Sequence, residues 1–369
     1  MKVRFLDLRI HDADQKKLLL DAIERVFDHG IMINGPELQA FEKKVAAFCN
    51  RNFAIGVNSG TGALFLALKS LGIGKGDEVI TTSLSWIATA NAIALTGASP
   101  VFADIDNDLN ISPDSVKKII SKHTKAILPV HYTGKICSIE DLQKIANENN
   151  IYLIEDAAQA FGAKRKNIIA GAFGDLACFS MNSMKIFASC GEAGIILTDN
   201  EKLCDHIFSL RYNGTINKET CIEPSLNARL DTIQAAILLE RIKDVPRIID
   251  KRREIAKLYN KYLEGIVKVP NENDEEYCVY YTYTIQASKR NELQSYLLSK
   301  GIETKIQHPI LMPDQPAYNK EKKGNIDNAK KIVNKILSLP ANEKISFDQV
   351  KYVSDCIKYF YNKDNHNGY

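Results

Sequence analysis

Short apolar runs alternate with helical repeats between residues 50 and 200, and this alternation constrains the fold more than any other feature. Helical spacing is clear after the first run, where Leu64, Leu68 and Leu71 fall on one face. Strands that alternate with helices form mostly parallel sheets. We therefore predict an α/β fold with a large domain built on a mostly parallel seven-stranded sheet. The predicted strands lie at 53–57, 78–82, 100–104, 126–130, 151–155, 176–180 and 194–198.

The pattern changes near residue 245, where a charged helical segment begins. A strand-like run follows at 279–286, and helical patterns follow near 289–300, 324–337 and 347–360. We predict a large domain over residues 1–245 and a smaller α+β C-terminal domain over residues 246–369.

Composition excludes several classes of function. The net charge is +3, and no basic stretch is interleaved with aromatic residues, so nothing points to nucleic-acid binding. No segment approaches about 18 consecutive apolar residues, so we expect no membrane span. The eight cysteines form no CxxC pair and are expected to be reduced thiols of a cytoplasmic protein. The seven histidines are dispersed, so we expect no metal site.

Two acids and a lysine follow predicted strands and are candidates for chemistry. Glu155 and Asp156 end a buried run, at the strand end where α/β sheets bind ligands. The alternative for such an acid is a helix cap. Lys185 lies between two predicted strands and is flanked by Met184, Ile186 and Phe187. Most lysines are solvated surface residues, but apolar surroundings favour a nucleophilic amine.

Two further patterns indicate a phosphate site and a flat aromatic wall. The glycine-rich run NSGTGALF opens a helix at Thr61, and the N–H groups of a helix start bind anions, although a plain helix cap is the alternative. Trp86, the sole tryptophan, follows a strand end, where core packing is the alternative. A phosphate anchor, a ring stack, a carboxylate and a nucleophilic lysine are what pyridoxal phosphate requires.

Nearly the whole chain resembles the DegT/DnrJ/EryC1/StrS sugar aminotransferases, a branch of the fold-type I, aspartate aminotransferase-like enzymes that depend on pyridoxal phosphate. The resemblance is carried by NSGTGALFLALKSLGIGKGDEVITTSLSWIATANAI, EDAAQAFGA, FGDLACFSMNSMKIFASCGEAGIILTDN and LNARLDTIQAAI. The chain departs from the commoner family pattern with FSMN before Lys185 and GEAG after it. These changes leave the cofactor residues in place and concern the substrate subgroup.

The resemblance implies a role for each matching residue. Lys185 matches the catalytic lysine that binds the cofactor covalently, and its presence argues against the family branch that carries histidine there and removes a hydroxyl group. Asn227 matches an asparagine that reaches the phosphate from the neighbouring subunit, which implies a homodimer with shared sites. The remaining cofactor contacts implied are Asp156 at the pyridine nitrogen, Gln159 near the phenolic oxygen, Gly60, Thr61 and Ser180 at the phosphate, and Trp86 on the ring.

The resemblance also implies the reaction. An amino group passes from L-glutamate to a keto group of a UDP-, GDP- or dTDP-linked deoxysugar, for surface glycan or glycoconjugate biosynthesis. Candidate substrate contacts are Arg229, Lys305 and His308, with Arg211 as a further cation in this region. Two alternatives stay open. One is an aminotransferase acting on a small keto or keto-cyclitol substrate, and the other is a regulatory protein that keeps the fold without catalysis.

Overall fold

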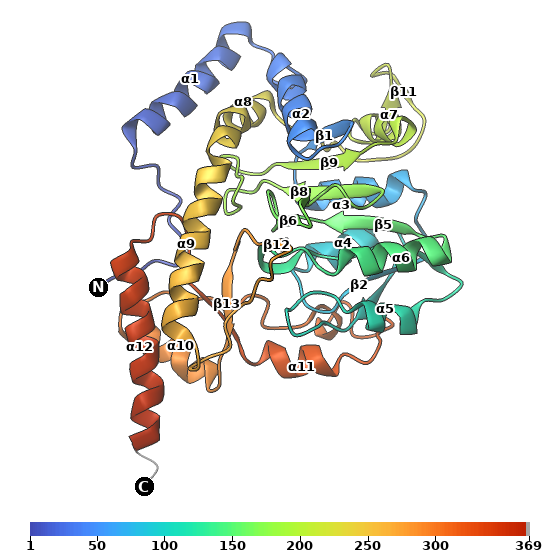
Figure 1. Ribbon diagram of the computed structural model, residues 1–369. Coiled ribbons are helices and arrows are strands. Elements are labelled where there is room, and N and C mark those ends of the chain that lie inside the picture. The colour runs from blue at the N-terminus through green and yellow to red at the C-terminus, as the bar shows by residue number, and fades with distance from the viewer. Residues whose placement is uncertain (367–369) are drawn as a thin grey trace.

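The computed structural model describes residues 1–366 of the 369 and is built around one seven-stranded sheet (Figure 1). The strand order is β1-β9-β8-β5-β4-β2-β3, and β9 runs in the direction opposite to the other six strands. The predicted fold class is confirmed. The strands are β1 (Phe53–Val57), β2 (Glu78–Thr82), β3 (Ser99–Ala103), β4 (Thr124–Leu128), β5 (Tyr152–Asp156), β8 (Leu176–Ser180) and β9 (Gly194–Thr198).

Helices cover both faces of this sheet, which explains why its strands read as continuous apolar runs. In β5, Leu153 belongs to the cluster beneath α2, α5, α6 and α8, whereas Ile154 belongs to the opposite cluster beneath α3, α4 and α7. Consecutive strand residues therefore enter two different cores. The helices are α2 (Pro36–Phe48), α3 (Gly60–Ser70), α4 (Ala88–Leu95), α5 (Pro113–Ile119), α6 (Ile139–Asn149), α7 (Glu201–Leu210) and α8 (Thr232–Arg241), and α1 (Ala13–His29) packs on α8.

A second, smaller unit contains most of the long helix α9, which leads away from the sheet (Figure 1). Its core contains Tyr259, Tyr283, Leu297 and Val353, and also Val3 from the N-terminal segment. We propose that the two units divide at the start of α9, near residue 245. The elements are α9 (Val245–Leu263), β13 (Tyr283–Gln286), α10 (Arg290–Ser299), α11 (Asp327–Val333), β14 (Ile336–Leu339) and α12 (Phe347–His366).

Two predictions for this unit were wrong at their edges. The helix expected over 324–337 ends at Val333, and Ile336–Leu339 forms a strand that pairs antiparallel with β13. All four residues of that strand are buried, so its apolar run reflects two covered faces and not one helical face. The strand expected over 279–286 is regular only from Tyr283, because Tyr280 has a φ of 49° and interrupts the extended backbone.

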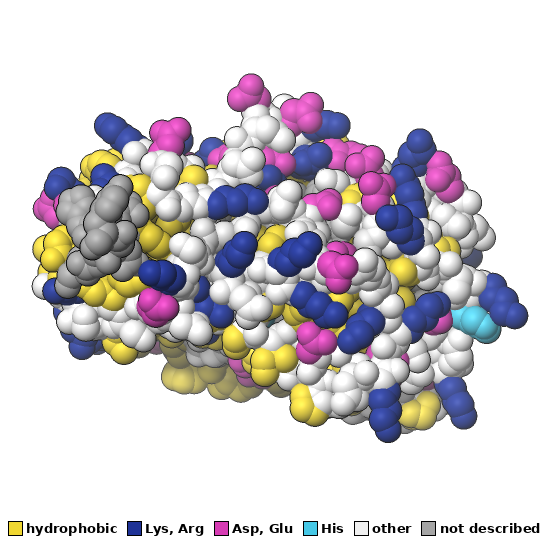
Figure 2. All heavy atoms as spheres, turned by 90° about the horizontal axis from the view of Figure 1, so that it is seen from below, with side chains coloured by type: hydrophobic (Ala, Val, Ile, Leu, Met, Phe, Trp, Pro, Cys, Tyr) yellow, Lys and Arg dark blue, Asp and Glu magenta, His cyan; other side chains and the backbone are white. Residues whose placement is uncertain are grey.

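One face of the molecule carries charges of both signs. On the face of the molecule seen from below, Lys and Arg side chains are interspersed with Asp and Glu, so that face carries no field of a single sign (Figure 2). No helix in residues 1–366 is long and apolar enough to cross a membrane.

Several short elements complete the fold. The short elements are β6 (Lys164–Arg165), β7 (Ile168–Ile169), β10 (Thr215–Ile216), β11 (Thr220–Cys221), β12 (Glu276–Tyr277), η1 (Tyr132–Gly134), η2 (Ile242–Asp244) and η3 (Met312–Asp314).

Candidate active site

A hollow of about 350 Å³ opens where parallel strands end and the smaller unit begins. Asp156 and Ser180 are the last residues of β5 and β8, and Gly60 begins the helix after β1. The sequence therefore predicted correctly that these strand ends meet at one place. The predicted residues that line the hollow are Gly60, Thr61, Trp86, Asp156, Gln159, Ser180, Lys185, Lys305 and His308.

Asp156 lies at the base of the hollow and is 4% exposed. No helix follows β5, so this acid is not a helix cap. Its carboxylate accepts hydrogen bonds from the Thr89 hydroxyl at 2.8 Å and from the Ala158 N–H at 3.2 Å. Burial raises the pKa of Asp156 above its ordinary value, and these two hydrogen bonds and the charge of Lys185 oppose that rise. The Asp156 carboxylate is thus shielded from water and oriented so that it can pair with a positively charged group.

Glu155, the other acid of the pair, faces away from the hollow and is fully buried. It accepts hydrogen bonds from the N–H groups of Gly171, Phe173 and Gly174 at 2.8 to 2.9 Å, and it lies 2.9 Å from His131 Nε2. Burial pushes the pKa of Glu155 upward, but the bonds from His131 and the backbone outweigh it and hold that pKa below its ordinary value. Glu155 thus ties the end of β5 to a neighbouring turn.

Lys185 follows β8 in a tight loop, where its N–H donates to the Asn182 carbonyl at 2.8 Å. The next residues, Ile186 and Phe187, are buried in the core, whereas Met184 is 44% exposed. The Lys185 Nζ lies 4.5 Å from the centre of the Tyr281 ring. Sequence reasoning missed Tyr281 and also Thr89, because no pattern in the sequence shows that the Tyr281 ring lies near Lys185 or that the Thr89 hydroxyl lies near Asp156.

The predicted phosphate cradle forms at the start of α3. Ser59 caps this helix by accepting a hydrogen bond from the Gly62 N–H at 3.0 Å. A Cβ atom added to Gly60 would lie 2.6 Å from Ser180 Cβ, so only glycine allows the end of β8 to approach the helix start. The first N–H groups of α3 and the Ser180 hydroxyl therefore converge on one spot, where an anion is favoured.

Trp86 is 62% exposed and lines the hollow, so it is not a core residue. Its ring centre lies 5.8 Å from that of His308, whose backbone is left-handed with a φ of 60°. Burial, together with the charges of Lys185 and Lys305, lowers the pKa of His308 to about 4, so its ring is neutral near pH 7. His308 Nε2 and Gln307 Oε1 are buried without a partner among the described residues, so both are available to a ligand.

Gln159 lies beside Asp156 and is 6% exposed. Its side-chain oxygen accepts a hydrogen bond from the Thr133 N–H at 2.9 Å, which fixes the orientation of the amide. Thr133 has a left-handed backbone, with a φ of 61°. The turn at Tyr132–Gly134 thus supports a predicted cofactor contact from behind.

Three predicted residues do not line this hollow. Asn227 is exposed and accepts a hydrogen bond from Arg229 Nε at 2.7 Å, while the Arg229 guanidinium lies over the Tyr212 ring. Arg211 is buried, where it pairs with Glu42 and donates to the Gly56 carbonyl. The expectation that Arg211 contacts substrate was wrong, because its buried guanidinium group binds Glu42 and a backbone carbonyl of β1 instead.

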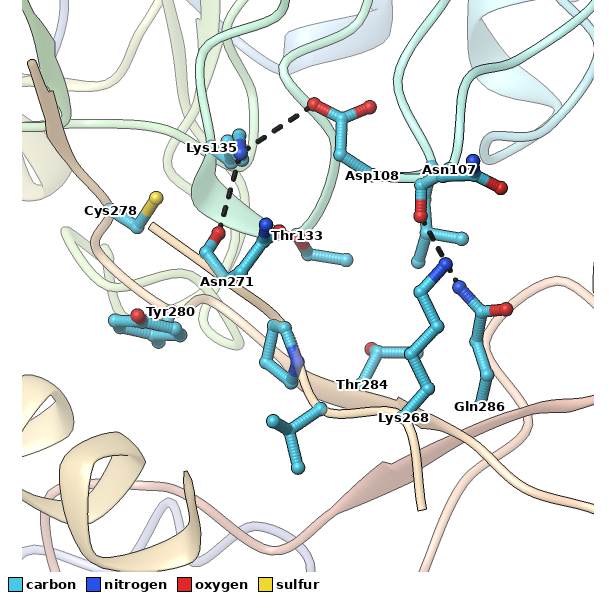
Figure 3. A pocket seen from close by; sticks show the side chains of 13 residues that line it. Asn107, Asp108, Thr133, Lys135, Lys268, Asn271, Cys278, Tyr280, Thr284 and Gln286 are labelled. Atoms are coloured by element: carbon cyan, nitrogen blue, oxygen red, sulfur yellow. Dashed lines mark hydrogen bonds and ion pairs between the residues drawn. The ribbon is translucent and has the colours of Figure 1, made fainter. Parts of the chain in front are cut away.

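A separate cavity of about 40 Å³ is lined by Thr133 of the η1 turn, by Lys135 and by Cys278 (Figure 3). Lys135 on its wall is paired with Glu276 at 2.9 Å and with Asp108 at 3.7 Å. Tyr280 and Thr133 also border this cavity (Figure 3). No cluster of three or more metal-ligating side chains occurs within residues 1–366.

The residues of the larger hollow fit pyridoxal phosphate. Its phosphate would be held at Gly60 and Ser180, where a Cβ atom would fill the cradle. Its pyridine nitrogen would be held by Asp156, and Trp86 offers an exposed aromatic face to its ring. Lys185 offers the amine that binds this cofactor covalently.

Known proteins match this chain over almost its full length. The model of the DegT/DnrJ/EryC1/StrS aminotransferase family matches residues 13–358. A pleiotropic regulatory protein of Geobacillus stearothermophilus is 35% identical, over 98% of this chain and 99% of that protein. A dTDP-3-amino-3,4,6-trideoxy-alpha-D-glucose transaminase of Streptomyces venezuelae is 34% identical, over 97% of this chain and 96% of that protein.

A solved structure agrees with both the fold and the cofactor. NtdA from Bacillus subtilis, with bound cofactor PMP, superposes with a TM-score of 0.90 at 30% identity, over 97% of this chain and 85% of NtdA. Because the family model spans most of the chain and the hollow carries the residues that the cofactor needs, this chain belongs to the DegT/DnrJ/EryC1/StrS family of pyridoxal-phosphate-dependent aminotransferases.

Proposed function

We propose that this chain transfers an amino group from L-glutamate to the keto carbon of a nucleotide-linked deoxysugar, for surface glycan or glycoconjugate biosynthesis. The observation that carries the proposal is the hollow itself, where Lys185, Asp156 and the cradle at Gly60 converge. The Streptomyces venezuelae relative is named for such a reaction on a dTDP-linked sugar, which supports the substrate class. The base of the nucleotide is left open among uracil, guanine and thymine.

The chemistry follows from where these side chains stand. Pyridoxal phosphate, when bound, supplies an electron sink that makes the α-hydrogen of an amino acid acidic. Lys185 then serves as general acid and base, because its Nζ stands in the hollow and is free to carry a proton to and from the substrate carbon. Asp156 keeps a positive charge stable on the ring nitrogen, because its carboxylate is buried and oriented by Thr89.

The far end of the substrate would lie toward the smaller unit. Lys305 and His308 line the hollow there, and Lys305 brings an exposed ammonium group suited to a diphosphate. His308 brings a neutral ring with a buried, unpartnered nitrogen suited to a hydroxyl or keto oxygen. These contacts would orient the sugar while Lys185 works at the keto carbon.

The active unit would be a homodimer. Asn227 and Arg229 lie outside the hollow of their own subunit, and Asn227 is exposed. We assign Asn227 to the phosphate site of the neighbouring subunit and Arg229 to substrate binding from the same surface. The eight free thiols fit our further proposal that the enzyme works in the cytoplasm.

A substrate panel tests the proposal. The purified protein is incubated with L-glutamate and with dTDP-, UDP- and GDP-linked keto sugars, free keto sugars and keto-cyclitols, and 2-oxoglutarate formation is measured. Amination that requires the nucleotide supports the proposal. Amination of the free compounds at equal efficiency would assign the chain to small keto substrates instead.

The regulatory alternative is supported by the name of the Geobacillus relative, a pleiotropic regulatory protein. Against it stands a hollow with an intact lysine, buried carboxylate and phosphate cradle. A protein that binds the cofactor yet produces no 2-oxoglutarate with any acceptor would support the regulatory function.

A further inference from the structure

The aromatic ring of Tyr281 lies against the predicted nucleophile. The Lys185 Nζ stands 4.5 Å from the centre of this ring, which is the distance of a cation–π contact. Within residues 1–366 this nitrogen makes no hydrogen bond or ion pair. The contact that the described residues offer this amine is therefore the face of the Tyr281 ring.

Tyr281 comes from the smaller unit and is carried by a segment that belongs to both units. Val279 packs in the core of the sheet domain, whereas Tyr280 packs in the core of the smaller unit. The chain turns at Tyr280, because the backbone of this residue is left-handed with a φ of 49°. Tyr280 borders the small cavity of Figure 3, while Tyr281 lines the larger hollow with Lys185.

The segment is also held from two sides. The Val279 N–H donates to the Gly134 carbonyl at 3.0 Å, which ties it to the η1 turn. Arg252, whose side chain is 5% exposed, donates to the carbonyls of Tyr280 and Tyr281 and is itself paired with Glu343 at 2.9 Å. The backbone that carries Tyr281 is thus held in place on both sides, and its side chain lines the hollow.

An aromatic face suits a lysine that must later be released. It attracts an ammonium group without the strong pairing of a buried carboxylate, so it orients the amine and still lets it react. We propose that Tyr281 is a positioning residue for Lys185. The Tyr281 ring holds the Lys185 amine at the place where the aldehyde group of the cofactor would bind. This inference rests on the proposed role of Lys185. The ring face is what acts, because no hydrogen bond from the Tyr281 hydroxyl to the described residues contributes to the contact.

A double-mutant cycle on the apoprotein tests the inference without using turnover. Affinity for pyridoxal phosphate is measured by fluorescence titration for the parent, Tyr281→Leu, Lys185→Ala and the double variant. We expect Tyr281→Leu to weaken binding about 2- to 5-fold when Lys185 is present, the value of one exposed cation–π contact. In the Lys185→Ala background the same change leaves the affinity unaltered. Tyr281→Phe keeps the ring and should bind as the parent does.

Two results would overturn the inference. Equal weakening by Tyr281→Leu in both backgrounds would mean that Tyr281 contacts the cofactor or supports the fold directly. A loss with Tyr281→Phe as large as with Tyr281→Leu would assign the effect to the hydroxyl group. Thermal unfolding of each apoprotein serves as the folding control, and Tyr281→Met replaces Tyr281→Leu if the latter unfolds. Failure of the proposed function would give a result distinct from these two. If Lys185 does not bind the cofactor, the Lys185→Ala variant alone will bind pyridoxal phosphate as tightly as the parent and keep its visible band.

Discussion

The hydroxyl group of Thr89 donates a hydrogen bond to the buried carboxylate of Asp156 at 2.8 Å. Thr89 lies in the first turn of α4 and Asp156 at the end of β5, so the contact joins a helix to the strand end that carries the acid. The bond counteracts the rise in the pKa of Asp156 that burial causes. It therefore favours the charged form of the carboxylate in a place where water is scarce.

Thr89→Val should expose this dependence. Loss of the hydrogen bond raises the pKa of Asp156 further, because the charged form loses about 1 kcal/mol of support while burial is unchanged. The acidic limb of the rate profile should therefore move to higher pH, since the charged form is the active one. Thr89→Ser keeps the donor and is the matched control. Identical pH profiles for Thr89→Val and the parent would contradict the role of Thr89.

Asp156→Asn should separate activity from stability. The amide cannot stabilise a positive ring nitrogen, so turnover should fall by at least about 100-fold while the cofactor stays bound. The pKa of Asp156 is raised in the folded protein, so its charged form disfavours the fold near pH 7. The apoprotein of the variant should therefore melt no lower than the parent in calorimetry. A variant that turns over as fast as the parent would refute the assignment.

Gly60→Ala should weaken binding of the cofactor's phosphate. The added methyl group would lie 2.6 Å from Ser180 Cβ, so the helix start and the strand end must separate. We expect at least about 10-fold weaker pyridoxal-phosphate binding by equilibrium dialysis, a loss of about 1.4 kcal/mol. Gly74→Ala is the control, because its methyl group meets only the Thr96 carbonyl oxygen at 3.4 Å. Equal affinities for Gly60→Ala and Gly74→Ala would contradict the cradle.

Mixing two inactive variants should restore activity if Asn227 serves the neighbouring subunit. Lys185→Ala and Asn227→Ala are each measured alone and then unfolded, mixed and refolded together. In a mixed dimer one site keeps its own Lys185 and receives Asn227 from the other chain, so about one quarter of all sites should be active after random pairing. No recovery, with mixed dimers demonstrated by mass spectrometry, would place Asn227 in the site of its own subunit.

The sequence predicted the sheet and most of the lining of the hollow, because both leave local patterns. Strands covered on two faces read as apolar runs, and parallel strands bring residues such as Asp156 and Ser180 to one edge. Thr89 and Tyr281 could not be predicted, because their roles come from contacts between distant segments. Arg211 was misassigned because a buried ion pair and a substrate contact look alike in a sequence.

The central claim, that Lys185 holds the cofactor and passes on an amino group, is tested most directly by the visible spectrum of the purified protein before and after L-glutamate is added. We expect a visible band that glutamate moves into the near ultraviolet, and a Lys185→Ala protein in which glutamate no longer produces 2-oxoglutarate. A parent protein without a visible band after added pyridoxal phosphate, or a Lys185→Ala variant that still transaminates, would contradict it.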